Sequence, residues 1–169
     1  MLGLLILISG VGPLIKTITA FTIAHSITLA AAVMGVITLE QAPVEAAIAL
    51  SIVLLAREIV VGYRGETHLV HQRPWLVAFI FGLLHGLGFA GALGEIGLRS
   101  PDVPLALLSF NLGVEVGQLA FVAVLIIMNQ LAGGVLRSHV PRFKPTLGYA
   151  LGTLSILWLF ERLPAVWGV

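Results

Sequence analysis

The stretch Thr22-Ile23-Ala24-His25-Ser26-Ile27-Thr28 lies within an apolar run from about residue 17 to residue 38. A run of this length can cross a bilayer as a helix. An ionisable residue in the middle of such a helix costs about 2–4 kcal/mol on insertion scales, so it normally faces a protein interior or a wet cavity. The stretch therefore predicts a membrane helix bundle with a polar interior organised around His25.

The composition places the whole chain in the membrane class. Of its 169 residues, 59% are hydrophobic and 10% are charged, and the mean hydropathy is +1.08. Soluble domains carry about 25% charged residues. The absence of cysteine excludes disulfides, zinc fingers, iron–sulfur clusters and thiolate catalysis. A net charge of +1 without a basic stripe gives no support for nucleic-acid binding.

Six apolar segments are predicted to be transmembrane helices of a single transmembrane domain over residues 1–169. Their length and continuity favour helices over the short alternating strands of a membrane barrel. The expected boundaries are about 1–14, 17–38, 44–63, 74–95, 103–130 and 146–163. Gly12-Pro13 marks an expected turn, and Pro74 stands where proline favours a helix start. The predicted fold is an all-α polytopic transmembrane helix bundle of about six helices.

The basic residues between the helices predict the orientation. Six of them fall on one side of the predicted bundle: Lys16, Arg64, Arg73, Arg137, Arg142 and Lys144. The other side carries Arg99 and Arg162. The positive-inside rule puts the more basic side in the cytoplasm. We therefore expect the 3–4 and 5–6 loops in the cytoplasm, and the start of the first helix and the C-terminus on the periplasmic side.

Two other predicted helices carry ionisable residues at the same depth as His25. These are His85 and Glu115, each within a few residues of its helix midpoint. Two histidines and one carboxylate are a recurrent ligand set with open positions for zinc, nickel, copper or iron, and these ligand types do not distinguish the four. We therefore expect a divalent transition metal at a midplane site. The alternative is a polar network that only fixes the helix register.

Polar neighbours on the same helix faces are candidates for supporting the ligands through hydrogen bonds. They are Thr22 and Ser26 beside His25, and Asn111 and Gln118 beside Glu115. In the helix of His85, Gly82 and Gly86 share the face of the histidine. Small residues at this spacing predict that the backbone of another helix comes close to this face.

Four residues near the cytoplasmic side are weaker candidates for gating or metal capture. Arg57 and Glu58 lie near the end of the third predicted helix. Because neighbouring residues on a helix point in different directions, we do not expect these two to pair with each other. His68 and His71 are three residues apart in a polar loop and are candidates for a metal-capturing mouth. A solvated loop is the simpler interpretation, and Arg57 is equally compatible with a head group that extends to the interface.

Three segments of the chain resemble the signature blocks of the HupE/UreJ family of bacterial membrane proteins. They are FTIAHSITL at 21–29, FGLLHGLGFA at 81–90 and FNLGVEVGQ at 110–118, in the same order as in the family. The resemblance implies a small multi-helix permease of the inner membrane, found with hydrogenase and urease accessory genes, that moves nickel or a related divalent metal. It places His25, His85 and Glu115 at motif positions.

Members of that family usually carry a Gly-x-Asp-His block in the first helix. Here Met1-Leu2-Gly3-Leu4 occupies the place directly after this block. Either the chain lacks this Asp–His pair or its natural precursor extends upstream of Met1. The predicted outside position of the N-terminus favours an upstream extension, because an outside N-terminus without a leader is difficult to make.

Three functions are compatible with these features. The leading hypothesis is a metal permease whose partners are the lipid bilayer and the metal ion. The second is a zinc-dependent intramembrane hydrolase, in which the metal activates water and Ser26 or Glu115 handles the proton. The third is a structural or accessory subunit of a larger membrane complex, or a homo-oligomer.

Overall fold

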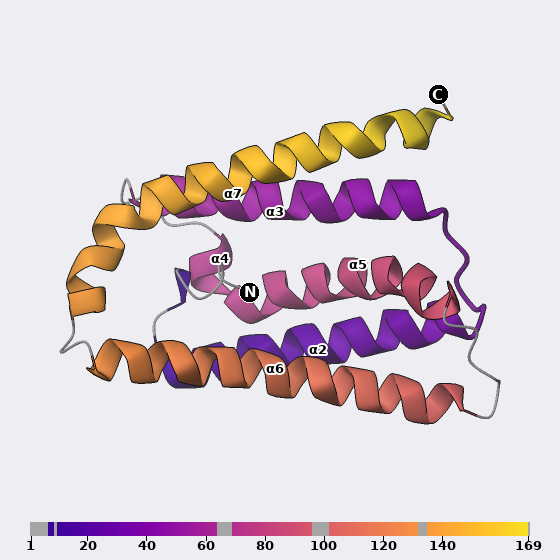
Figure 1. The fold of residues 1–169 in the computed structure, drawn as a ribbon, viewed down its shortest axis with the longest axis horizontal. Helices are drawn as coiled ribbons and strands as arrows, with labels where there is room; N and C mark the ends of the chain where they lie inside the picture. Colours follow the sequence, from indigo (N-terminus) through magenta and orange to yellow (C-terminus); the bar gives the residue numbers. More distant parts are fainter. Residues whose placement is uncertain (1–6, 9, 64–68, 96–101, 132–134, 169) are drawn as a thin grey trace.

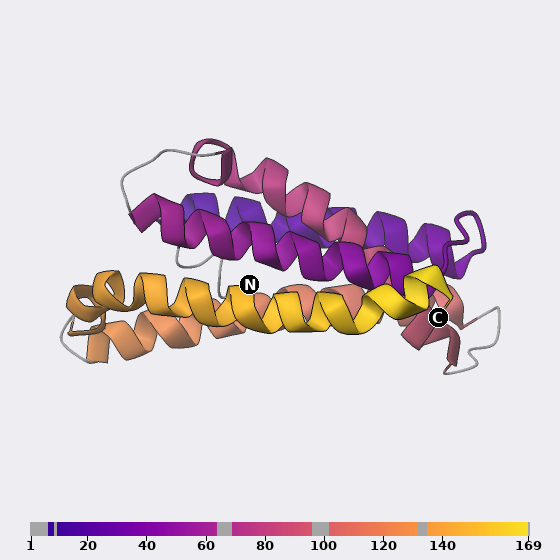
Figure 2. The ribbon, with the colours of Figure 1, turned by 90° about the horizontal axis from the view of Figure 1, so that it is seen from above.

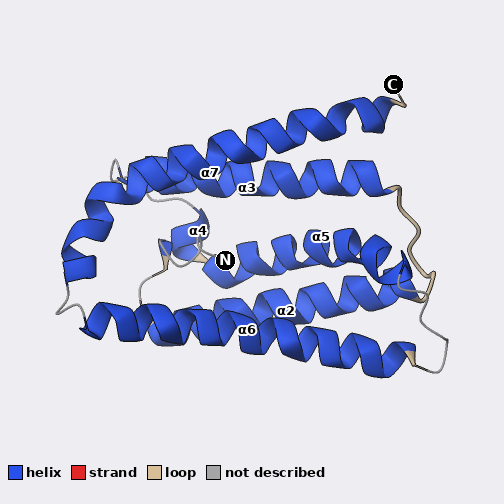
Figure 3. Cartoon of the chain, viewed as in Figure 1, coloured by secondary structure: helices blue, strands red, loops and turns tan. Residues whose placement is uncertain are grey.

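The computed structural model describes residues 7–8, 10–63, 69–95, 102–131 and 135–168. Every labelled element in this part of the chain is a helix (Figure 3). The helices are α2 (Val11–Val33), α3 (Gln41–Tyr63), α4 (Leu69–Gln72), α5 (Pro74–Glu95), α6 (Val103–Leu131) and α7 (Val135–Trp167). The all-α prediction is confirmed, with five long helices and one short helix in the described residues instead of about six similar ones.

The predicted turn at Gly12-Pro13 is wrong, because α2 begins at Val11 and runs through it. Pro13 lies in the first helical turn, where the missing N–H costs no intrahelical hydrogen bond. The hydroxyl of Thr17 donates to the Pro13 carbonyl at 2.7 Å, which is a contact of a continuous helix. The end of the predicted first helix therefore belongs to α2, and residues 1–6 and 9 lie outside the described part.

The end of α2 comes earlier than predicted, at Val33. Gly35 has a φ of +73°, a left-handed conformation that a glycine adopts at no steric cost. Its N–H donates to Ala32, and the N–H of Val36 donates to Ala31. This pair of hydrogen bonds is the Schellman motif, which satisfies the last carbonyls and stops the helix.

The last helix is longer than predicted, because α7 begins at Val135 and passes through Pro145. Proline inside a helix removes a hydrogen bond and usually bends the axis. Figure 1 shows such a bend in the first part of α7. The predicted start at about residue 146 is therefore wrong, because the first turns of this helix lie before Pro145.

The five long helices are arranged in two layers (Figures 1 and 2). One layer holds α6 and α7, and the other holds α2, α3 and α5. The closest helix pairs are α2 with α5 and α3 with α7, whereas α6 and α7 hardly touch. The bundle is therefore two tightly packed helix pairs, with α6 laid against α2.

Two glycines explain the close packing of α2 and α5. A methyl group added at Gly82 would collide with the Phe21 carbonyl, and one at Gly86 would collide with the His25 carbonyl and the Thr28 hydroxyl. Only a residue without a side chain lets the two backbones approach this far. The predicted small face on the helix of His85 is confirmed.

Three of the described helices are long and apolar enough to cross a membrane. The spans are Val11–Val33, Pro74–Gly91 and Val103–Met128. They belong to α2, α5 and α6, the helices that carry the three predicted metal ligands. The polar residues singled out from the sequence therefore lie within apolar helices.

Candidate functional site

A cavity of about 410 Å³ lies inside the bundle, between the two helix pairs. All five long helices contribute to its wall. The lining residues are Phe21 and His25 of α2, Ser51, Ile52, Leu55 and Ala56 of α3, Phe81, His85 and Phe89 of α5, Phe110, Val114 and Gln118 of α6, and Leu151 of α7. Both intramembrane histidines thus face one shared space.

His25 is held in one orientation by Asn111. The side chain of His25 is 2% exposed, and its Nδ1 lies 3.0 Å from Asn111 Oδ1. The amide nitrogen of Asn111 donates to the Leu107 carbonyl at 2.8 Å, so its oxygen is the atom that faces the imidazole. An oxygen only accepts here, which places the proton of neutral His25 on Nδ1. The lone pair of His25 then lies on Nε2.

His85 is held in the same way by its own helix. Its Nδ1 lies 2.7 Å from the carbonyl oxygen of Phe81, one turn earlier in α5. A carbonyl oxygen has no proton to donate, so neutral His85 also carries its proton on Nδ1. Within the described residues, Nε2 of neither histidine makes a hydrogen bond. An Nδ1–H bonded to an oxygen and a free Nε2 is the usual arrangement of a metal-binding histidine.

Phenylalanine rings surround the two imidazoles. Phe21 contacts both, with ring centroids 5.9 Å from His25 and 5.5 Å from His85. Phe89 and Phe110 contact His25 at 5.6 Å and 6.1 Å. The only polar parts of the wall apart from the imidazoles come from Ser51 and Gln118, as far as the structure describes it. The site therefore combines two nitrogen ligands with a mainly apolar wall.

Glu115 does not line this cavity. Its Oε1 accepts a hydrogen bond of 3.1 Å from the Thr19 hydroxyl, at the contact of α2 with α6. Among the described residues, no group of three His, Asp or Glu side chains is placed to hold a metal ion. The structure thus brings His25 and His85 together and leaves Glu115 apart from them, and the three-ligand site stays a prediction.

The supporting residues predicted from the sequence fall into different surroundings. Asn111 contacts His25 directly, whereas the Ser26 hydroxyl donates to the Thr22 carbonyl within α2 at 2.7 Å. Gln118 lines the cavity. Its Oε1 and the Thr22 hydroxyl are buried without a hydrogen-bond partner in the described part of the molecule. Asn111 is therefore the one candidate that orients a predicted ligand.

The expectation that Arg57 and Glu58 do not pair is wrong. Arg57 Nη1 lies 3.2 Å from Glu58 Oε1, because the long arginine side chain curls around the helix toward its neighbour. The pair is not among the residues that line the cavity. His68 lies outside the described residues, and His71 belongs to α4 but its side chain is not described. The gating and capture roles of these four residues stay predictions.

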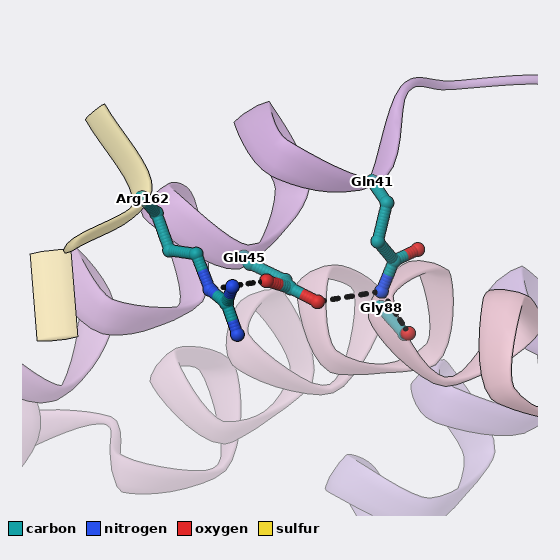
Figure 4. Close-up of polar contacts among 4 residues, drawn as sticks. All are labelled: Gln41, Glu45, Gly88 and Arg162. Carbon is teal, nitrogen blue, oxygen red and sulfur yellow. Dashed lines mark hydrogen bonds and ion pairs between the residues drawn. The ribbon is translucent and has the colours of Figure 1, made fainter. Parts of the chain in front are cut away.

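A polar network connects α3, α5 and α7 near the C-terminal end of α7 (Figure 4). Arg162 Nε and Glu45 Oε2 form an ion pair of 2.6 Å, and Glu45 Oε1 accepts from Gln41 Nε2 at 3.1 Å. The same Gln41 nitrogen donates to the Gly88 carbonyl at 2.8 Å. In the described part of the chain, this is the one side-chain hydrogen bond that joins α3 or α7 to α2, α5 or α6.

Sequence reasoning missed the aromatic wall, although a signal for it exists. Phe21 precedes His25 by four residues, and Phe81 precedes His85 by the same spacing. Residues four apart share a helix face, so each phenylalanine had to lie beside its histidine. The contributions of α3 and α7, such as Ser51, carry no comparable signal because they depend on tertiary packing.

Comparison with known proteins agrees with the sequence blocks. The model of the family described as HupE / UreJ protein matches residues 1–162. No curated protein and no solved structure matches the chain. The family match covers nearly the full length, including α2, α5 and α6. With the buried His25 and the half-buried His85 on apolar helices, the chain belongs to the HupE/UreJ family.

Proposed function

We propose that this protein is a membrane permease for a divalent transition metal ion, with the cavity between the helix pairs as its binding site. Membership of the HupE/UreJ family supports a membrane protein linked to metal transport. The resemblance of the sequence blocks makes nickel the first ion to test. Zinc, copper and iron suit the same nitrogen ligands, so they belong in the same test.

The observation that carries the proposal is that both histidines have the same hydrogen-bonding arrangement, with Nδ1 bonded and Nε2 free within the described residues. In both rings Nδ1 is committed to an oxygen, Asn111 Oδ1 for His25 and the Phe81 carbonyl for His85. Both side chains line the same cavity. A polar network that merely fixed helix register would use both ring nitrogens for hydrogen bonds. The free Nε2 atoms favour ligand binding.

Glu115 enters the proposal as a ligand of a later conformation, after the metal has bound to the two histidines in the conformation described here. Its carboxylate is bonded to Thr19 here, so it would have to leave that partner before it could reach the ion. It belongs to the same helix as Asn111 and lies one turn further along. A modest rotation or shift of α6 against α2 is the movement that this role requires.

We further propose the bacterial inner membrane as the location, with the basic end of the bundle in the cytoplasm. The starts of α2 and α5 lie at the same end of the bundle (Figure 1), and Lys16 and Arg73 belong to these two segments of the sequence. The Lys16 ammonium lies 4.8 Å from the centre of the Trp75 ring. Tryptophan and lysine side by side are typical of a membrane interface.

Reconstitution in liposomes tests the transport proposal. We expect wild-type protein to carry Ni²⁺ across the bilayer and purified protein to bind it, and we expect His25→Ala and His85→Ala to lose both activities. Ser26→Ala is the matched control, because Ser26 neighbours His25 but its hydroxyl is bonded to the α2 backbone. Unchanged binding and uptake in both histidine variants would refute the proposal.

A further inference from the structure

The described residues that line the cavity carry no charged side chain. Their polar groups are the imidazoles of His25 and His85, the Ser51 hydroxyl and the Gln118 amide, and no Asp, Glu, Lys or Arg is among the described lining residues. A divalent cation that entered alone would keep its charge in apolar surroundings. Moving an unpaired charge from water into such surroundings is very costly, and neutral ligands offset only part of that cost.

A fully hydrated ion is also a poor fit to this space. Buried waters usually make about three hydrogen bonds each, so a shell of six would need many polar partners. The Ser51 hydroxyl already donates to the Ile48 carbonyl at 2.6 Å, and both Nδ1 atoms are committed. Apart from the two Nε2 atoms, the Gln118 amide is the main group left to bind water.

We propose that the substrate of this site is a neutral chelate, in which a small organic dianion cancels the charge of the metal ion. This inference rests on the proposed function and names the form in which the metal enters the cavity. The chelate keeps its dianion and exchanges two metal-bound waters for Nε2 of His25 and Nε2 of His85. The net charge of the site is then zero before and after binding.

The remaining features of the cavity fit such a ligand. Its volume of about 410 Å³ leaves room for an organic ligand on the metal beside the two histidines. The phenylalanine rings beside the imidazoles offer apolar surface to the organic part of the chelate. Gln118 lines the cavity and its Oε1 is buried without a partner in the described residues, so its amide is the polar group of the wall whose hydrogen bonds are incomplete.

Retention of two labels by the purified full chain tests the inference. The probes are radioactive Ni²⁺ in a non-coordinating buffer, the same ion with one equivalent of ¹⁴C-malonate, and its complex with 2,2′-bipyridine. Malonate gives a neutral 1:1 chelate, whereas bipyridine leaves the charge at +2. We expect nickel and malonate to be retained together in equal amounts, and the malonate chelate to bind at least about tenfold more tightly than the other two forms.

His25→Ala and His85→Ala should lose both labels, and Ser26→Ala should keep both. The inference is overturned if the protein retains nickel but no malonate, and if adding malonate lowers nickel binding only as much as it lowers the concentration of free Ni²⁺. It is also overturned if Glu115→Gln abolishes that binding of the free ion, because the protein would then supply the negative charge itself. If no form depends on the histidines, the proposed function fails first.

Discussion

Asn111 accepts the Nδ1 proton of His25 at 3.0 Å while its own amide nitrogen is fixed to the Leu107 carbonyl. The second bond matters because it prevents the amide from turning its nitrogen toward the ring. Asn111 is 8% exposed, so water does not readily replace it. The asparagine therefore sets which nitrogen of His25 is available to a ligand.

Removing this acceptor should weaken metal binding. In Asn111→Leu the His25 proton loses its partner and the ring loses its fixed orientation, so we expect nickel affinity to fall about 10–100-fold. Asn111→Asp keeps an acceptor and should keep most of the affinity. ¹⁵N NMR of the metal-free protein should show His25 protonated on Nδ1 in the wild type and a mixture of tautomers in Asn111→Leu. Equal spectra in these two proteins would show that Asn111 does not set the tautomer.

The contact of α2 with α5 should be highly sensitive to added volume. Gly86→Ala places a methyl group against the His25 carbonyl and the Thr28 hydroxyl, and we expect a loss of about 1–3 kcal/mol in the free energy of unfolding. Gly113→Ala is the matched control, because nothing lies within 4 Å of a methyl group at that position of α6. Unfolding in detergent micelles, followed by circular dichroism, compares the two. A similar change in both variants would contradict the close approach seen here.

Metal binding should weaken as the pH falls through the range in which imidazole takes up a proton. Each bound ion requires both Nε2 atoms free of protons, so protons compete with the metal at two sites. The logarithm of the apparent affinity should approach a slope of two against pH in the wild type, and any residual binding in His25→Ala should approach a slope of one. Titration calorimetry at several pH values measures both slopes. Equal slopes would mean that His25 is not a ligand.

Much of the fold follows from local sequence signals, and the errors have a common physical cause. Pro74 marks the start of α5, and the apolar runs predict α2, α5 and α6. Gly12-Pro13 predicts a turn and the last helix is predicted to begin only at about residue 146, yet Pro13 lies in the first turn of α2 and Pro145 lies inside α7. Proline can start, bend or end a helix, and which of these occurs depends on its distance from the helix start. The local sequence does not reveal that distance.

The candidate site was predictable only in part. His25 and His85 are identified by their cost in an apolar helix, and the structure gives both the same cavity. Glu115 satisfies the same criterion, but its carboxylate bonds to Thr19 instead. The position of a residue along a membrane helix can be predicted from the sequence. Which neighbouring helix its side chain faces depends on how the helices pack. The Arg57–Glu58 pair contradicts the prediction for a related reason. The two residues point away from the helix axis in different directions, but the long arginine side chain still reaches the carboxylate of its neighbour.

The polar network of Figure 4 should contribute little stability through its ion pair and somewhat more through its cross-helix hydrogen bond. Arg162 and Glu45 side chains are 43% and 21% exposed, so solvent screens their attraction, and Arg162→Gln should cost at most about 1 kcal/mol. Gln41→Leu removes the hydrogen bond to the Gly88 carbonyl between α3 and α5 and should cost about 0.5–1.5 kcal/mol. Unfolding in detergent at low and high salt separates the two effects, because added salt should shrink the first loss and leave the second unchanged. A salt-independent loss above about 2 kcal/mol in Arg162→Gln would mean that the ion pair is shielded from solvent and clamps α3 to α7.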